Sequence, residues 1–204
     1  MNEHLLRKYF IMGSQNCVND PRDILLKAIE AGITMFQFRE KGSGSKNGNE
    51  KLKLGLELRE ICKTYDIPFI VNDHVELVNV LEADGIHVGQ DDVSVEKLRK
   101  QFPYKIIGLS ISNQDELKRS PINLVDYIGT GPIFGSKTKE DAKKPVGLEW
   151  IRSLRNQGLT LPIVGIGGIN ETNAQQVLEA GANGVSVISA ITKSNHIFET
   201  VQKL

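Results

Sequence analysis

The sequence has few cysteines, no excess of charge of either sign and no long apolar run. Its 204 residues include two cysteines, Cys17 and Cys62, in no CxxC or metal-like spacing. We expect structural thiols in a reducing compartment, and a disulfide between them is the less favoured alternative. Lys and Arg total 25, as do Asp and Glu, so nothing indicates the basic face that a nucleic-acid partner usually needs.

Membrane and export signals are also missing. No segment approaches the ~18–20 apolar residues of a membrane span, and the N-terminal MNEHLLRKYF lacks the apolar core of a signal peptide. We therefore expect a cytoplasmic protein with neither a membrane nor a nucleic-acid partner. The sequence leaves its oligomeric state open.

Short apolar segments rich in β-formers recur along the whole chain, and several are continuously apolar, which is typical of strands covered on both faces. They occupy residues 9–12, 35–39, 69–72, 85–88, 106–110, 127–130, 163–166 and 184–188. Eight strands in this length leave roughly 25 residues per unit, near the lower size limit of a TIM barrel.

Helical patterns fall between most of these strands. Residues 20–32 have Pro at the first helical position and end in Gly, and 49–65 form a longer helix. A helix within 170–181 is expected to be capped by Asn170. The alternation, without a GxGxxG after the first strand, favours an α/β fold, a (βα)8 TIM barrel in one domain over residues 1–204. A doubly wound open sheet is the runner-up.

Two polar loops, 40–49 and 134–147, interrupt the compact pattern. Both follow predicted strands, so both should lie on the C-terminal face of the barrel, where active sites of this fold are found. We expect them to be mobile lids, although solvated loops are the usual structures of such composition.

Glycine-rich segments follow the seventh strand (164–170) and form the eighth (184–190). Glycine lets backbone N–H groups approach an anion, and the loops after these two strands form the recurrent phosphate site of TIM barrels. The segments predict a phosphorylated ligand, against the alternative that the glycines only permit tight turns.

A second anion site is suggested by Gln37, Arg39 and Lys41, because the period of two in a strand places them on one face. A guanidinium grips phosphate oxygens bidentately and an ammonium acts as a point charge. If this face lined the barrel mouth it would suit a highly charged anion. The alternative is an exposed strand end with surface ion pairs.

Carboxylates at neighbouring strand ends suggest a Mg²⁺ site. Asp73 ends the third strand, and Asp91 and Asp92 follow the fourth. Mg²⁺ prefers oxygen ligands and commonly binds substrate phosphate as well. A helix cap and a turn are the structural alternatives.

Hydroxyl and ammonium groups at Ser110 and, in the sixth loop, Ser136, Thr138 and Lys139 could hold a substrate amine or a diphosphate. His87, in the fourth strand, is interpreted as a core or lining residue rather than a base.

Taken together, several motifs resemble the thiamine-phosphate synthase family. They occur in that family's order and span most of the chain: QFREK (37–41), VND (71–73), GQDD (89–92), GLS (108–110), GPIFGSKTK (131–139), GIGGI (165–169) and GVSVISAI (184–191). The resemblance implies a transferase of thiamine biosynthesis. It would join 4-amino-5-hydroxymethyl-2-methylpyrimidine diphosphate to 4-methyl-5-(2-phosphoethyl)thiazole, or its carboxylate, through a dissociative carbocation mechanism that releases pyrophosphate.

The resemblance also implies residue roles. The pyrimidine diphosphate would be bound by Gln37, Arg39, Lys41, Asn72, Ser110 and Lys139. Arg39, Lys41, Ser110 and Lys139 would be catalytic. Mg²⁺ would be held by Asp73 and Asp92, and the thiazole phosphate by Ser136, Thr138, Gly168, Ile188 and Ser189.

Two positions depart from the family pattern: a usual Thr is Ser136, and a frequent His is Ser112. The missing His disfavours the related thiazole tautomerase. An aldolase or epimerase barrel is a further alternative, but a Schiff-base aldolase needs a strand lysine, and the predicted strands contain none. A non-catalytic regulator that binds a phosphate ligand is the last alternative, disfavoured because the cationic pair and both aspartates are present.

Overall fold

Eight parallel strands close into a barrel in the computed structural model, which describes residues 2–135 and 144–204. They are β1 Lys8–Met12, β2 Met35–Phe38, β3 Phe69–Asn72, β4 Gly85–Val88, β5 Ile106–Ser110, β6 Tyr127–Thr130, β7 Ile163–Ile166 and β8 Gly184–Val187. Each strand pairs with its sequence neighbour, and β8 pairs with β1. The predicted TIM barrel is confirmed, with strand limits within one residue, and the open sheet is excluded.

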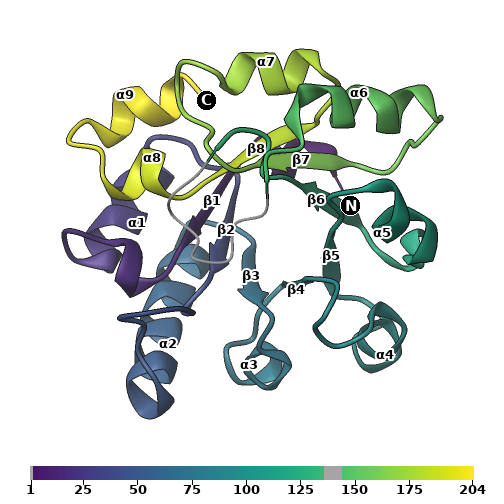
Figure 1. Cartoon of the computed structure of the whole chain (residues 1–204). Helices are drawn as coiled ribbons and strands as arrows, with labels where there is room; N and C mark the ends of the chain where they lie inside the picture. The colour runs from purple at the N-terminus through teal and green to yellow at the C-terminus, as the bar shows by residue number, and fades with distance from the viewer. Residues whose placement is uncertain (1, 136–143) are drawn as a thin grey trace.

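Helices surround the barrel on its outside (Figure 1). They are α1 Pro21–Glu30, α2 Gly48–Thr64, α3 Val75–Val80, α4 Val95–Gln101, α5 Gln114–Arg119, α6 Gly147–Asn156, α7 Ala174–Glu179, α8 Ser189–Thr192 and α9 Ile197–Gln202. Asp20 caps α1 as its position before Pro21 predicts, accepting the N–H of Arg22 at 2.9 Å.

The predicted cap of α7 is wrong. The side chain of Asn170 accepts the N–H of Thr172, so it closes the turn before the helix. The helix itself begins at Ala174, and Asn173 occupies the cap position. Asx side chains stabilise turns as readily as helix starts, and a local pattern does not separate the two.

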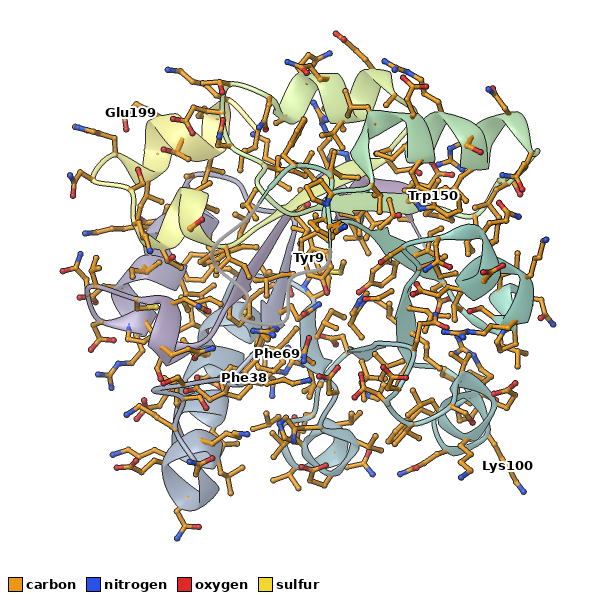
Figure 2. All side chains as sticks on the ribbon, viewed as in Figure 1. Tyr9, Phe38, Phe69, Lys100, Trp150 and Glu199 are labelled. Atoms are coloured by element: carbon orange, nitrogen blue, oxygen red, sulfur yellow. The ribbon has the colours of Figure 1, made fainter. Side chains whose placement is uncertain are left out.

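Side chains alternate between the two faces of each strand, and this alternation divides the apolar residues into two cores. Outward-facing residues such as Phe10, Phe36 and Phe69 pack beneath the helices. Inward-facing residues such as Tyr9, Met35 and Ile70 fill the barrel interior. Tyr9 lies near the centre of the ribbon in Figure 2, whereas Lys100 and Glu199 extend from its periphery. A pocket opens above this filled interior, at the C-terminal ends of the strands.

Two arginines bind residues near strand starts at the N-terminal end of the barrel. Arg99 of α4 donates to Asp126 at 2.7 Å, and Asp126 also accepts the N–H of Ile107 at 2.8 Å. Arg155 of α6 repeats the arrangement with Asn183, at 2.6 Å. These hydrogen bonds connect α4 and α6 to residues that directly precede β6 and β8, at the end of the barrel opposite to the pocket.

One lysine does lie in a strand, contrary to the sequence expectation. Lys8 opens β1, and its Nζ donates to the carbonyl of Val201 at 2.7 Å. Burial, followed by the nearby charge of Arg7, lowers the pKa of Lys8. Because Lys8 begins the strand, it lies at the end of the barrel opposite to the C-terminal pocket and gives no support to a Schiff-base site.

Cys17 and Cys62 are both free thiols. Within residues 2–135 and 144–204, no helix combines the length and apolarity needed to cross a bilayer.

Candidate active site

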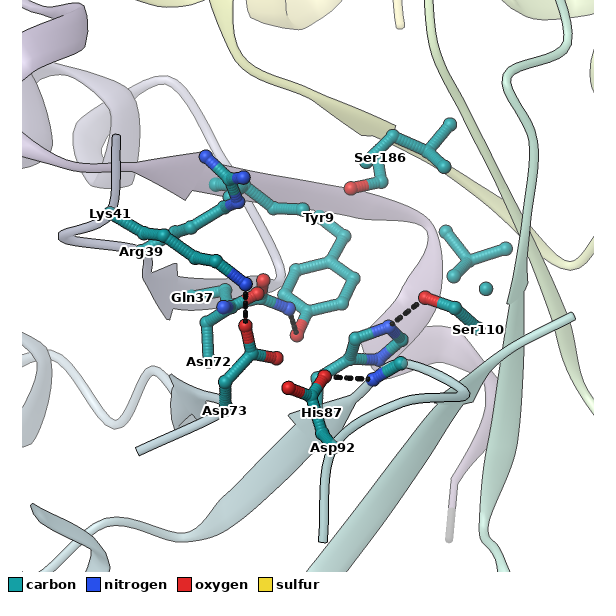
Figure 3. Close-up of a pocket in the computed structure, with 15 residues that line it drawn as sticks. Tyr9, Gln37, Arg39, Lys41, Asn72, Asp73, His87, Asp92, Ser110 and Ser186 are labelled. Atoms are coloured by element: carbon teal, nitrogen blue, oxygen red, sulfur yellow. Dashed lines mark hydrogen bonds and ion pairs between the residues drawn. The ribbon is translucent and has the colours of Figure 1, made fainter. Parts of the chain in front are cut away.

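A pocket of about 130 Å³ opens at the C-terminal ends of the strands (Figure 3). Its lining comes from every strand of the barrel or from the residues that follow it. It is made by Tyr9, Ile11, Gln37, Arg39, Lys41, Asn72, Asp73, His87, Gly89, Asp92, Ser110, Gly129, Val164, Ile166 and Ser186. The structure thus brings together seven of the residues expected from the sequence: Gln37, Arg39, Lys41, Asn72, Asp73, Asp92 and Ser110.

The floor of the pocket is a continuous hydrogen-bonded chain. Nε2 of Gln37 lies 2.7 Å from the Tyr9 hydroxyl, which lies 2.9 Å from the Tyr127 hydroxyl. The chain continues from Tyr127 to Nδ1 of His87 at 3.0 Å and from Nε2 of His87 to Oγ of Ser110 at 2.9 Å.

One bond of this chain has a fixed direction. An amide nitrogen can only donate, so the Tyr9 hydroxyl accepts from Gln37. Either hydroxyl can donate between Tyr9 and Tyr127, and the roles of the two His87 nitrogens depend on its tautomer. The tautomer with its proton on Nε2 would accept from Tyr127 and donate to Ser110.

Sequence reasoning missed Tyr9 and Tyr127, although polar aromatics at inward positions of strands are a usable signal. It correctly treated His87 as a lining residue. Burial raises the pKa of both phenols above the ordinary tyrosine value. Both hydroxyls are therefore protonated donors at neutral pH.

Glycine at position 108 makes space for this chain. A Cβ on Gly108 would lie 2.2 Å from the Tyr127 ring and 2.5 Å from Nδ1 of His87. The glycine of the GLS motif is therefore required by the packing of two side chains from neighbouring strands.

Buried polar side chains form the wall above the floor. Arg39 and Asn72 are 8% and 7% exposed, and both line the pocket. Ser186 of β8 points into the same space, and its buried Oγ has no hydrogen-bond partner within the described parts of the chain (Figure 3). A buried hydroxyl without a partner is costly, which makes Ser186 a further candidate ligand contact.

Charges of both signs meet at the rim. Lys41 Nζ lies 2.7 Å from Asp73, and this hydrogen bond raises the pKa of Lys41. Burial, followed by the negative charge of Asp73, raises the pKa of Asp92 against the opposing Gly89 N–H, which donates at 2.7 Å. Asp73 also has a φ of +59°, a conformation that is strained for a non-glycine residue. Asp91 is not among the lining residues, as the expected alternation requires.

The expected phosphate-binding backbone lies after β7 and β8. Gly168 has a φ of +66°, and a Cβ there would lie 2.6 Å from the carbonyl oxygen of Gly135. Ile188 precedes α8 and Ser189 begins it. None of the three is among the residues that line the pocket. Ser136, Thr138 and Lys139 lie outside the described residues.

The donor set at the rim fits an oxygen-seeking cation. Asp73 and Asp92 are close enough for one carboxylate to raise the pKa of the other, a repulsion that a cation would relieve. Across the described residues, no group of three or more His, Cys, Asp and Glu gathers into a ready-made metal site. Two carboxylates suit Mg²⁺, which commonly completes its shell with water and substrate phosphate.

The closed barrel and the polar, charge-rimmed pocket at its C-terminal end define an enzyme of the TIM-barrel class. The chain belongs to the thiamine monophosphate synthase family, whose model matches residues 8–191. It is 62% identical over 203 residues to the thiamine-phosphate synthase of Oceanobacillus iheyensis, covering 100% of this chain and 98% of that one. The enzyme of the same name from Staphylococcus carnosus is 52% identical, over 97% of this chain and 94% of its own.

A solved structure supports the same assignment. Thiamine phosphate pyrophosphorylase from Pyrococcus furiosus superposes with a TM-score of 0.86 at 29% identity, covering 99% of this chain and 95% of that one.

Proposed function

We propose that this protein condenses 4-amino-5-hydroxymethyl-2-methylpyrimidine diphosphate with 4-methyl-5-(2-phosphoethyl)thiazole to give thiamine phosphate and pyrophosphate. Family membership supports the overall reaction. The observation that carries the residue assignment is the gradient of the pocket, from neutral hydrogen-bonding groups on its floor to charged groups at its rim. An aminopyrimidine linked to a diphosphate has the same gradient.

The floor suits the pyrimidine ring. Ring nitrogens accept hydrogen bonds and the exocyclic amine donates them, and Gln37 and Ser110 offer groups of both kinds. Gln37 is held in place by the hydrogen bond that it donates to the Tyr9 hydroxyl, and Ser110 by its hydrogen bond with His87. Asn72 and Ser186 extend the polar lining toward the rim.

The diphosphate would lie above, against Arg39 and Lys41, with Lys139 of the sixth loop joining them. Their task is electrostatic: as the bond from the pyrimidine methylene to oxygen breaks, negative charge grows on the departing pyrophosphate. Fixed cations stabilise that charge more than they stabilise the bound substrate, which lowers the barrier. The thiazole nitrogen then attacks the carbocation, and no protein base is needed for this step.

Asp73 and Asp92 would hold Mg²⁺, which supplies further charge neutralisation on the diphosphate when bound. Lys41 orients the Asp73 carboxylate for this task through their 2.7 Å contact. Ser110, catalytic by the same resemblance, would direct its hydroxyl proton to the substrate in the His87 tautomer that donates to it through Nε2.

The thiazole phosphate would be bound by the backbone at Gly168, Ile188 and Ser189, with Ser136 and Thr138 contributing hydroxyls. Such phosphate sites after the seventh and eighth strands are common in TIM barrels. The loops after β2 and β6 would exclude water that could trap the carbocation. A cytoplasmic location is proposed because both thiols are free.

Incubation of the protein with both substrates and Mg²⁺ tests this function directly. Thiamine phosphate and pyrophosphate should appear in equal amounts, and neither should form if one substrate is omitted. Substrate binding without turnover would favour a regulator on the same scaffold. Consumption of the thiazole alone would favour a tautomerase.

A further inference from the structure

The segment between β1 and α1 holds the backbone that carries the two cationic residues. Gln15 lies in a short 3-10 helix, Ser14–Asn16, directly after β1. Its amide nitrogen donates to the carbonyl oxygen of Arg39 at 3.0 Å and to that of Lys41 at 2.9 Å. Both N–H bonds of one amide are therefore used on the two residues assigned to the diphosphate.

Glu40 fixes the residue between them from the opposite side. Its side chain is 2% exposed and accepts three hydrogen bonds. The N–H and hydroxyl of Ser14 donate at 2.7 and 2.5 Å, and the N–H of Lys46 donates at 2.6 Å. The alternation of side chains along the extended chain turns Glu40 away from the pocket while Arg39 and Lys41 line it.

Close packing at Gly13 lets Gln15, the first of the two anchors (Gln15 and Glu40), reach the backbone of Arg39. A Cβ on Gly13 would lie 2.1 Å from the carbonyl oxygen of Arg39 and 2.3 Å from Oε1 of Gln15. That Oε1 is buried without a hydrogen-bond partner among the described residues. Burying an acceptor without a partner lowers the stability of the fold. The contribution of Gln15 therefore comes from the two hydrogen bonds that its amide nitrogen donates.

We propose that Gln15 and Glu40 are positioning residues that set Arg39 and Lys41 on the leaving diphosphate. The proposal rests on the function proposed above, in which these two cations neutralise that group. Electrostatic stabilisation depends on placement, and a displacement of about 1 Å can cost a hundredfold in rate. Neither Gln15 nor Glu40 is among the residues that line the pocket. They would act through the backbone of residues 39–41, which they hold by hydrogen bonds and packing.

Gln15→Met and Glu40→Gln test the proposal. Met keeps the length of Gln and removes both donors, while Gln at position 40 keeps the shape and removes the charge. We expect either change to raise the KM for the pyrimidine diphosphate, and the Kd for inorganic pyrophosphate, by about tenfold to a hundredfold. The KM for the thiazole phosphate should change less than about twofold.

Matched substitutions away from the pocket are the controls. Gln157→Met makes the same change at an exposed amide paired with Gln114. Asp126→Asn weakens a carboxylate that accepts a backbone N–H at the other end of the barrel. Asp126→Asn should lower the Tm and leave both KM values unchanged.

Three results decide the matter. If Gln15→Met or Glu40→Gln lowers the Tm but leaves the KM for the pyrimidine diphosphate unchanged, the anchors are only structural and the proposal fails. If Glu40→Gln does not fold, Gln15→Met decides alone, since it alters no charge. If Arg39→Ala itself has normal kinetics, the diphosphate assignment fails instead. If Arg39→Ala does impair the kinetics, the double variant gives a further test. Gln15→Met should then raise the KM for the pyrimidine diphosphate by a smaller factor in the Arg39→Ala background than in the native enzyme.

Discussion

Removing the Tyr127 hydroxyl should lower the stability of the fold and weaken substrate binding in the pocket. That one oxygen contacts Tyr9 of β1 and His87 of β4. In Tyr127→Phe, the Tyr9 hydroxyl loses its contact at 2.9 Å and Nδ1 of His87 loses its contact at 3.0 Å. Each buried group left without such a partner costs about 1–3 kcal/mol. The ring keeps its packing, so we expect a total loss of about 2–4 kcal/mol in the free energy of unfolding.

Urea unfolding followed by circular dichroism measures this loss. Tyr104→Phe is the matched control, because Tyr104 is 98% exposed and its substitution should stay within about 0.5 kcal/mol. The substitution also removes one of the hydrogen bonds that orient the His87 ring, which should raise the KM for the pyrimidine diphosphate. A Tyr127→Phe protein as stable as Tyr104→Phe would refute the view that the hydrogen bonds of the pocket floor stabilise the fold.

The remaining predictions concern the phosphate site, the metal and the response to alkali. Gly168→Ala should raise the KM for the thiazole phosphate more than that for the pyrimidine diphosphate, since an added Cβ would meet backbone at 2.6 Å; equal effects would contradict the assignment. EDTA should abolish activity, Mg²⁺ should restore it, and Asp92→Asn should be far more damaging than Asp91→Asn in steady-state assays. Retained activity in EDTA would exclude the metal role. Burial raises the pKa of Tyr9 and Tyr127, so their protonated forms stabilise the fold fully below pH about 10. Above that pH the unfolded phenols ionise first, and stability should fall by about 1.4 kcal/mol per pH unit for each group. Thermal melting across pH 8–11 checks this, and a flat Tm would contradict it.

The sequence by itself determined the barrel and much of the rim. Continuous apolar segments at a regular spacing identify buried parallel strands because each strand packs on both faces. The period of two then places Gln37, Arg39 and Lys41 on one side, and the common direction of the strands places Asp73 and Asp92 at the same end. These are properties of single strands and of their order, so a one-dimensional pattern contains them.

Only the tertiary structure decided the floor and the anchors. Tyr9 and Tyr127 are separated by 118 positions, and their contact follows from the closure of the barrel. Gln15 reaches Arg39 because Gly13 has no side chain, which no spacing rule predicts. Asn170 was assigned to the wrong role because a turn and a helix cap use the same side-chain chemistry. Hydrogen bonds between distant strands depend on register, side-chain reach and local space together, and those are fixed only when the whole chain has packed.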